Sequence, residues 1–247
     1  MAKVALVTGS AKGIGAAIIE ELALSGYDCV INYNTSRDLA YKLYYKIKDY
    51  GIRALVIKCD VSDEASVNEM FNEIESKLGG VDILVNNAAV DIPELFSRKK
   101  VEDFRKTLDV NLIGAFLTAK RAERHMLDNK WGRVINISST NGMNTYYPMG
   151  IEYDASKAAL NSLTHNLAIE FAPYVTVNAV APGLIGTESE IADYDDEFMQ
   201  MELDKILVRR IGEAKEVAKL VKFLVSDDAS YINNSIIRID GGQYSSN

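Results

Sequence analysis

Seven short apolar runs alternate with longer segments of helical periodicity, and this alternation constrains the fold more than any other feature of the chain. The runs cover residues 4–7, 29–32, 54–57, 81–85, 133–137, 175–180 and 235–239. Helical patterns cover residues 14–25, 37–50, 65–78, 101–127, 153–171 and 214–225. Near-continuously apolar strands separated by helices are typical of a parallel sheet with helices on both faces. We therefore expect one doubly wound α/β domain over residues 1–247, with a seven-stranded parallel sheet and ligands at the carboxyl ends of its strands.

The composition is that of an ordinary globular protein without a nucleic-acid-binding surface. Hydrophobic residues make up 48% and charged residues 25% of the 247 residues. A formal net charge of -8, without a basic stripe, argues against nucleic acid as a partner. Cys29 and Cys59 lie in or beside apolar runs, as small buried side chains do in a reducing compartment, and neither has metal-ligand spacing. With no visible targeting or membrane-spanning segment, we expect a cytoplasmic protein that binds neither metal nor membrane.

A glycine-rich turn follows the first apolar run and precedes the first helical pattern. Gly9, Gly13 and Gly15 have the spacing Gly-x-x-x-Gly-x-Gly within residues 8–15. Glycines at such a place let the backbone approach a pyrophosphate, whose charge is favoured at a helix amino terminus. The turn therefore indicates a dinucleotide site, the alternative being a glycine-rich turn that binds no ligand.

The end of the second apolar run, Asn32-Tyr33-Asn34, bears on the choice of nucleotide. An acidic residue here would bind a ribose 2′-hydroxyl and repel a 2′-phosphate, but Asp28 lies at the wrong end of the run. Hydrogen-bond donors and positive charge come instead from Lys12, Thr35, Ser36 and Arg37. The pattern favours NADP over NAD, although Arg37 also fits a solvated residue at a helix start.

The pair Tyr153 and Lys157 stands one helical turn apart, so both side chains project from one face of the helix. A free tyrosine ionises near pH ~10, and a neighbouring ammonium group lowers that pKa towards neutrality. The pair can therefore form an acid/base couple, although the same spacing also occurs on ordinary helix surfaces, where the lysine is solvated.

Several further motifs accompany this pair in a fixed order along the chain. They are Thr8-Gly-x-x-x-Gly-x-Gly15, Asp60-Val61, Asn86-Asn-Ala-Ala89, Asn111, Ser138-Ser139, Tyr153-x-x-x-Lys157, Asn178-Ala-Val-Ala-Pro-Gly183, Thr187 and Asp240-Gly-Gly242. With these motifs, the chain resembles the classical short-chain dehydrogenase/reductase family over essentially its whole length. It departs from the family pattern at Ala89 and Ala214, and at Asn233-Asn234 in place of a frequent Thr-Gly.

The resemblance implies a Rossmann-type fold and an enzyme that transfers a hydride between nicotinamide and a carbonyl or secondary alcohol. It implies that Tyr153 exchanges a proton with the substrate oxygen, and that Lys157 lowers the tyrosine's pKa and binds the nicotinamide ribose. Ser139 would hold the substrate oxygen, with Ser138 as the alternative serine. Asn111 would bend its helix and hold a water that connects Lys157 to solvent.

The resemblance also implies the contacts with the cofactor. The pyrophosphate would lie against the glycine turn, the adenine against Asp60 and Val61, and the adjoining ribose against Asn87. The nicotinamide would lie against Pro182, Gly183, Ile185 and Thr187. With the residues that bear on the 2′-phosphate, the expected cofactor site comprises Gly9, Ser10, Lys12, Gly13, Ile14, Gly15, Asn34, Ser36, Arg37, Asp60, Val61, Asn87, Tyr153, Lys157, Pro182, Gly183, Ile185 and Thr187.

The polar segment of residues 186–210 is where this family has its substrate lid. Here it carries Glu188, Glu190, Asp193, Asp195, Asp196 and Glu197 interleaved with Tyr194, Phe198, Met199 and Met201. Such a segment reads as a mobile cover with an apolar underside, or equally as a solvated acidic loop.

The substrate is the least constrained inference. The closest resemblance is to 3-oxoacyl-[acyl-carrier-protein] reductases of fatty acid biosynthesis, and the alternative is to glucose or polyol dehydrogenases. An acidic carrier protein would need a basic patch near the cleft, for which Lys130 and Arg133 are the candidates. Glu170-Phe-Ala-Pro173 lacks an arginine that would extend this patch, and the acidic lid would repel such a partner. The acyl reductase stays first because it is the more frequent activity in the family, and the expected partner is a small-molecule or acyl-thioester substrate, with acyl carrier protein as a further candidate.

Two inferences concern the whole protein. The resemblance implies a homotetramer, because in this family the second apolar faces of the helices around Asn111 and Tyr153 pair between subunits. A remote alternative is a nucleotide-sensing protein that kept the fold and lost the chemistry. It predicts a damaged catalytic set, whereas Asn111, Ser139, Tyr153 and Lys157 are all present.

Overall fold

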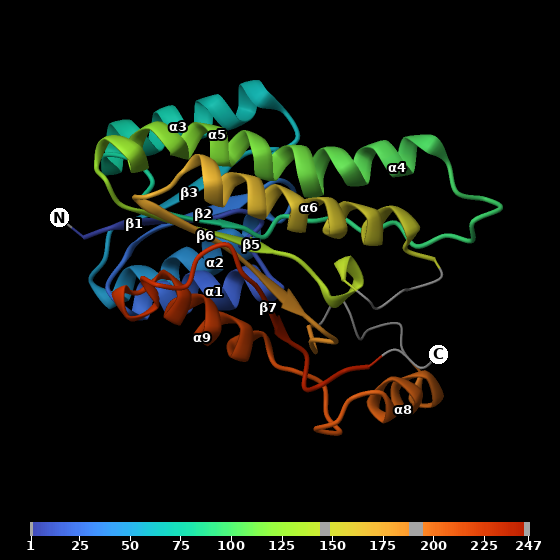
Figure 1. The fold of residues 1–247 in the computed structure, drawn as a ribbon. Helices are drawn as coiled ribbons and strands as arrows, with labels where there is room; N and C mark the ends of the chain where they lie inside the picture. The colour runs from blue at the N-terminus through green and yellow to red at the C-terminus, as the bar shows by residue number, and fades with distance from the viewer. Residues whose placement is uncertain (1, 144–148, 188–194, 245–247) are drawn as a thin grey trace.

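The computed structural model describes residues 2–143, 149–187 and 195–244, and its centre is one parallel sheet. The strands are β1 (Val4–Val7), β2 (Asp28–Tyr33), β3 (Ala54–Lys58), β4 (Ile83–Asn86), β5 (Gly132–Ile137), β6 (Val175–Pro182) and β7 (Ile236–Ile239). They lie in the order β3-β2-β1-β4-β5-β6-β7, and every neighbouring pair is parallel (Figure 1). The seven-stranded parallel sheet is thereby confirmed. The chain turns from one half of the sheet to the other between β1 and β4, which is where such folds bind nucleotides.

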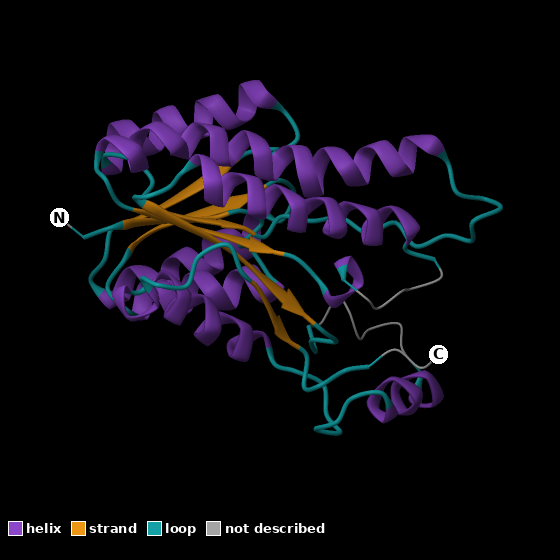
Figure 2. Ribbon diagram, in the orientation of Figure 1, coloured by secondary structure: helices purple, strands orange, loops and turns teal. Residues whose placement is uncertain are grey.

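Helices cover both faces of the sheet (Figure 2). One layer comprises α1 (Gly13–Leu24), α2 (Arg37–Ile47) and α9 (Ala214–Val225). The other comprises α3 (Glu64–Leu78), α4 (Val101–Leu108), α5 (Gly114–Asp128) and α6 (Ile151–Glu170). Because both faces are covered, the central strands are buried along their whole length, which explains why they read as unbroken apolar runs.

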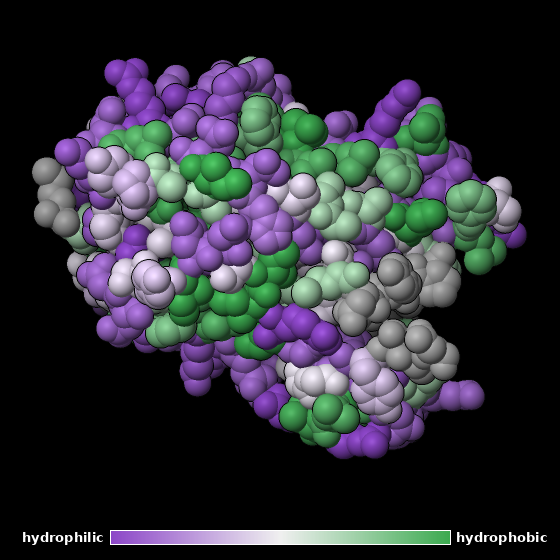
Figure 3. Space-filling view, in the orientation of Figure 1, coloured by the Kyte–Doolittle hydropathy of each residue, from purple (hydrophilic) through white to green (hydrophobic). Residues whose placement is uncertain are grey.

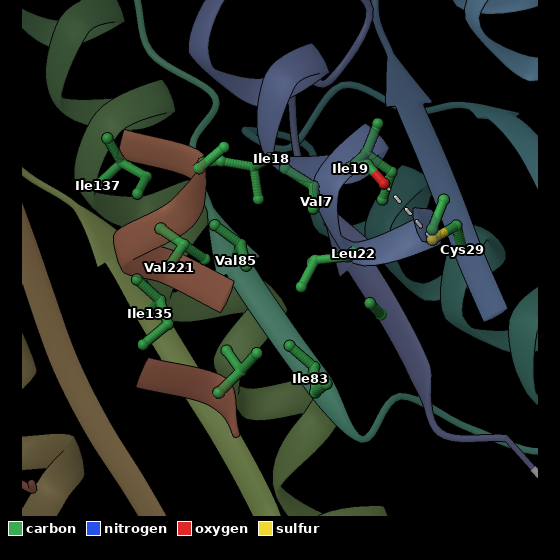
Figure 4. Close-up of a cluster of buried hydrophobic side chains, with 14 of the residues drawn as sticks. Val7, Ile18, Ile19, Leu22, Cys29, Ile83, Val85, Ile135, Ile137 and Val221 are labelled. Atoms are coloured by element: carbon green, nitrogen blue, oxygen red, sulfur yellow. Dashed lines mark hydrogen bonds between the residues drawn. The ribbon is translucent and has the colours of Figure 1, made fainter. Parts of the chain in front are cut away.

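Each layer encloses its own hydrophobic core. In Figure 4, Ile18, Ile19 and Leu22 of α1 pack against Val7 of β1 and Val221 of α9. Cys29 belongs to the same cluster, with its thiol directed at the Ile19 carbonyl oxygen at 3.8 Å, and burial raises its pKa. Cys59 is buried in the opposite core. Both thiols are free, so the expectation of two small buried side chains is confirmed.

The long helix expected over residues 101–127 is interrupted. It consists of α4, a π-helical turn at Asp109–Ile113 and α5. A π turn holds one residue more than an α turn, and here that turn carries the buried Asn111. The helix is therefore interrupted at Asn111, where a bend is expected.

The segment expected as a lid contains a helix that periodicity did not predict, α8 (Asp196–Asp204). Asp195 caps it by accepting a hydrogen bond from the Phe198 amide at 2.8 Å. The expected lid residues Glu188, Glu190, Asp193 and Tyr194 lie outside the described residues. In the described part of the chain, no helix is long and apolar enough to cross a membrane, and no group of histidine, cysteine and acidic residues could hold a metal ion.

Candidate active site

The glycine turn closes against the end of β4. Gly9 has a φ of +62°, and a Cβ there would lie 2.9 Å from the Ala88 Cα atom. A Cβ on Gly15 would lie 2.4 Å from the Asn87 side-chain nitrogen, which donates to the carbonyl oxygens of Thr8 and Gly9. Only glycine allows this approach, because any side chain would push the turn away from β4.

The amino terminus of α1 is open at this turn. The helix has no side-chain cap and no acidic residue in its first turn, so its first amide groups and its dipole can receive an anion. Gly13, at the start of the helix, faces Thr187, whose methyl carbon would lie 3.7 Å from a Cβ on Gly13. The expected pyrophosphate contacts and the expected nicotinamide contact thus lie side by side, as a dinucleotide that spans them requires.

Asn32 shapes the same turn, which sequence reasoning missed. Its side-chain oxygen accepts from the Gly9 backbone amide at 2.9 Å, and its backbone amide donates to the Ser10 hydroxyl at 3.1 Å. Ser10 is fully buried, so its side chain serves the turn and points to the sheet. The spacing of Asn32 after Gly9 carries no recognisable signal, because the contact joins two strands.

The residues expected around the adenosine lie at the ends of β2 and β3. The Asn34 side chain donates to Asp60 at 3.0 Å, and Ser62 donates to the other oxygen of Asp60 at 2.6 Å. These bonds, the Ser62 hydroxyl foremost, lower the pKa of Asp60, which therefore stays ionised. Lys12 and Arg37 are both exposed, and the Arg37 guanidinium lies over the Tyr41 ring at 5.3 Å.

Tyr153 and Lys157 meet on one face of α6. The Lys157 ammonium group lies 5.3 Å from the centre of the Tyr153 ring and donates to the Ile137 carbonyl oxygen at 2.8 Å. Lys157 is buried, and this burial lowers its pKa to about 8. A lysine that titrates near pH 8, beside a half-buried tyrosine, can share a proton with the phenol.

The two serines after β5 have different surroundings. Ser138 is buried and donates to the Asn161 side-chain oxygen at 2.7 Å, which fixes it to α6. Ser139 is only partly buried, and its hydroxyl caps the short helix Thr140–Gly142 by accepting from the Asn141 amide at 3.2 Å. The Ser139 hydroxyl proton is not used in that bond, which favours Ser139 over Ser138 as the residue that holds a substrate oxygen.

Asn111 joins three segments from within the π turn. Its side-chain oxygen accepts from the Val90 amide at 2.8 Å, and its nitrogen donates to the Val90 carbonyl oxygen and the Ser156 hydroxyl, each at 3.0 Å. Ser156 in turn donates to the Tyr153 carbonyl oxygen at 2.7 Å. Asn111 therefore anchors the helix turn that carries Tyr153, and its expected water contact with Lys157 stays a prediction.

The expected nicotinamide residues follow β6. Pro182 ends the strand, and the Gly183 amide donates to the Ile239 carbonyl oxygen at 3.1 Å. A Cβ on Gly183 would lie 2.7 Å from the Asp240 Cβ, so β7 holds this turn closely. Ile185 is buried and Thr187 lies opposite the glycine turn. Asn178 is fully buried and binds the backbone of Ile232 and Ser235, as expected of a purely structural residue.

Comparison with known proteins agrees with this arrangement. Residues 9–244 match the family model described as enoyl-(acyl carrier protein) reductase. A 3-oxoacyl-[acyl-carrier-protein] reductase from Aquifex aeolicus (strain VF5) is 41% identical over 98% of this chain and 97% of its own length. Glucose 1-dehydrogenase 2 from Bacillus subtilis (strain 168) is 36% identical over 97% of this chain and 94% of its own. The crystal structure of a blue fluorescent protein from a metagenomic library, in complex with NADPH, has a TM-score of 0.91 and 32% identity, and covers 97% of both chains.

The chain belongs to the short-chain dehydrogenase/reductase family. It is an oxidoreductase of the class that acts on CH–OH groups. The resemblance drawn from its motifs is thereby confirmed.

The core of this dehydrogenase/reductase also holds a polar network that sequence reasoning missed. Asn86 donates to Asn136 at 2.9 Å and accepts from Thr118 at 2.6 Å, and Asn136 donates to Thr164 at 2.8 Å. All four residues are buried. The network fixes β4 and β5 to the helices α5 and α6, and so holds the strand ends in place beside the helix that carries Tyr153 and Lys157.

One expectation about this dehydrogenase/reductase is wrong. Lys130 and Arg133 are the candidates for a basic patch near the cleft. They lie at the amino end of β5, whereas Ser139 follows the carboxyl end of the same strand. Arg133 is moreover buried, with its guanidinium 4.5 Å from the Trp131 ring and 3.5 Å from the carboxylate of Asp227. A patch there does not border the cleft of its own subunit.

Proposed function

We propose that the protein transfers a hydride between NADP and a carbonyl or secondary alcohol, with Asn111, Ser139, Tyr153 and Lys157 as the catalytic set. The observation that carries the proposal is the buried Lys157, with a pKa of about 8, against the Tyr153 ring. The glycine turn supports it, because its close approach to β4 and the open start of α1 fit a pyrophosphate. When bound, the nicotinamide supplies the hydride chemistry.

The residues of the chain handle the proton and the substrate oxygen. Tyr153 donates its phenolic proton to the carbonyl oxygen during reduction and takes it back during oxidation. Lys157 stabilises the phenolate while it exists, and its short bond to Ile137 keeps the ammonium group beside the ring. Ser139 holds the substrate oxygen with the hydroxyl proton that its bond from the Asn141 amide does not use.

The nucleotide preferred is NADPH, with NAD less favoured. No acidic side chain follows β2, where it would bind the ribose 2′-hydroxyl, and Asn34 lies there instead, bound to Asp60. Lys12, Ser36 and Arg37 supply donors and charge for a 2′-phosphate. The structural relative bound to NADPH supports the same choice.

The substrate class proposed first is a 3-oxoacyl thioester, with or without acyl carrier protein, because the relative at 41% identity is such a reductase. Glucose or another polyol comes second, on the relative at 36% identity. To rank them, NADPH consumption is followed with an acetoacetyl thioester, and NADP reduction with glucose and polyols. An enoyl thioester is included because of the description of the matching family model. We expect turnover of the 3-oxoacyl thioester. If the protein oxidised a sugar and did not reduce this thioester, the sugar would become the first candidate substrate.

The Tyr153→Phe protein is the control for these assays. We expect kcat to fall by about 10²- to 10⁴-fold, the usual contribution of a general acid, while NADPH still binds. A Tyr153→Phe protein as active as the parent with every carbonyl would instead favour the nucleotide-sensing alternative.

The segment of residues 186–210 is proposed as the lid. The carboxyl-terminal residues hold its distal half, because the Val208 amide donates to Gly241 and the Tyr244 hydroxyl donates to the Asp204 carbonyl oxygen, each at 3.1 Å. Phe198 and Met199 are partly buried within α8, which fits a cover with an apolar underside.

We also propose that the protein is a cytoplasmic homotetramer, its two free buried thiols fitting a reducing compartment. Figure 3 shows apolar side chains among polar ones over α5 and α6. Exposed apolar side chains here are Ile113 of the π turn, Phe116 of α5 and Ile169 of α6. Phe116 and Leu167 line a groove between these two helices. Size-exclusion chromatography with light scattering tests the proposal, and a monomer at micromolar concentration would contradict it.

A further inference from the structure

A buried ion pair lies directly beside the catalytic tyrosine. Lys99 belongs to the loop between β4 and α4, and Glu152 precedes Tyr153 in the first turn of α6. Their charged atoms are 2.7 Å apart, and the two side chains are 5% and 0% exposed. No other ion pair among the described residues has both side chains below one-tenth exposed.

The Lys99 ammonium group binds three separate segments. Besides Glu152, it donates to the carbonyl oxygen of Ile92 at 2.5 Å and to that of Met149 at 3.1 Å. The Met149 oxygen also accepts from the Glu94 amide at 3.2 Å. All three ammonium protons are therefore used. They connect the loop after β4 to the residues that lead into α6 and to α6 itself, which run close together beyond the strand ends (Figure 1).

Stability alone does not explain such a pair. Removing two charges from water costs several kcal/mol per ion, and apolar side chains of similar volume are often as stable or more so. The second oxygen of Glu152 is buried without a hydrogen-bond partner among the described residues, which adds to that cost. The charge of Glu152 also acts on the loop, where Asp91 has its pKa raised first by burial of its carboxyl and then by Glu152.

We propose that Lys99 and Glu152 are positioning residues, which hold the loop of residues 91–100 against the helix turn that carries Tyr153. The loop follows Val90, which Asn111 binds, so Tyr153 is held from two sides: through Ser156 and Asn111, and through Glu152 and Lys99. The pair thereby sets the position of this loop relative to the helix turn of Tyr153. This inference rests on the proposed carbonyl reduction for its kinetic consequence only.

The test is the double variant Lys99→Met/Glu152→Leu, which keeps the volumes and removes both charges. We expect its thermal unfolding midpoint to stay within about 4 °C of the parent's, because the relief of desolvation offsets the lost bonds. We expect kcat for the carbonyl substrate to fall by about 10- to 100-fold, since small misplacements are costly, with KM for NADPH unchanged. Amide hydrogen exchange in residues 91–100 and 149–156 should become at least about tenfold faster.

A matched control is Arg53→Met/Asp28→Asn, which removes an ion pair at the amino end of β2, far from the site. It should leave kcat and the exchange of residues 91–100 at the parent's values. Glu152→Gln, which preserves shape and one acceptor, should give a smaller fall in kcat and the same direction of exchange.

Kinetics and exchange within about twofold of the parent in the double variant would overturn the inference. The exchange measurement needs no substrate. If the unmodified protein reduced no carbonyl, the proposed function would be wrong. If hydrogen exchange were unchanged in the double variant, only the positioning role would be wrong.

Discussion

At the scale of single residues, the two serines after β5 make a matched experiment. Ser139→Ala removes the serine hydroxyl proposed to hold the substrate oxygen beside the Tyr153 phenol, so kcat should fall by about 10- to 1000-fold with little loss of stability. Ser138→Ala leaves the Asn161 side-chain oxygen unpaired in the core, so it should cost about 1–3 kcal/mol of stability and affect kcat less. Steady-state kinetics and thermal unfolding of both variants show which serine contacts the substrate and which one only stabilises the fold. The reverse pattern would assign the substrate contact to Ser138.

Lys157 gives a prediction in which stability and activity oppose each other. Its pKa is about 8 in the folded protein and ordinary in the unfolded chain, so the unfolded state binds more protons between these values. The cost in folding stability of burying the Lys157 ammonium group is therefore full below pH 8 and decreases as pH rises towards ~10.5. Lys157→Met should be about 2 kcal/mol more stable than the parent at pH 7, after the lost bond to Ile137 is counted.

The advantage of Lys157→Met should shrink by about 2 kcal/mol between pH 7 and pH ~9.5, while carbonyl reduction is nearly abolished at every pH. Denaturant unfolding of the two proteins at several pH values measures it. A constant difference would show that Lys157 does not titrate in this range.

At the scale of elements, the short helix Thr140–Gly142 and α6 must touch for Ser139 to face Tyr153. A Cβ on Gly142 would lie 2.6 Å from the Lys157 carbonyl carbon, which is backbone and cannot yield locally. Gly142→Ala should therefore push the two elements apart, lowering kcat by about tenfold or more and stability by about 1–3 kcal/mol. The control is Gly26→Ala, where a Cβ meets nothing within 4 Å and φ is +86°. It should cost about 1 kcal/mol and leave kcat unchanged. Equal kinetics in both variants would show that this contact does not set the site.

The helices and strands also show which features of the fold could be predicted from the sequence. Continuous apolar runs located every strand, and the one-turn spacing brought Tyr153 and Lys157 to one face of α6, because these signals are local. The role of Ser139 was implied by the family resemblance, because no local pattern connects it to Tyr153. The π turn was missed because apolar periodicity continues through it while one extra residue rotates Asn111 inwards. The Lys99–Glu152 pair was missed because its members are 53 residues apart and neither has a local signal. Lys130 and Arg133 were misplaced because they lie at the amino end of β5, whereas the site lies at the carboxyl ends of the strands.

At the scale of the whole molecule, net charge bears on acyl carrier protein as a partner. The chain carries a formal charge of -8, and carrier protein is acidic, so their long-range interaction is repulsive. Asp195 and Asp196 add negative charge at the start of α8, in the segment proposed as the lid, and the expected basic patch lies at the amino ends of the strands. Delivery by carrier protein must therefore proceed against the overall field.

This repulsion predicts an unusual response to salt. The value of kcat/KM for an acetoacetyl-carrier-protein substrate should rise severalfold as NaCl goes from low concentration to above 0.1 M, because the Debye length falls below about 10 Å and the repulsion is screened. The neutral N-acetylcysteamine thioester of the same acyl group is the control, and its kcat/KM should not change with salt. Initial rates of NADPH oxidation measure both. A kcat/KM for the carrier-protein substrate that falls with salt would instead require a basic docking surface, and in a tetramer that surface could come from Lys130 of a neighbouring subunit.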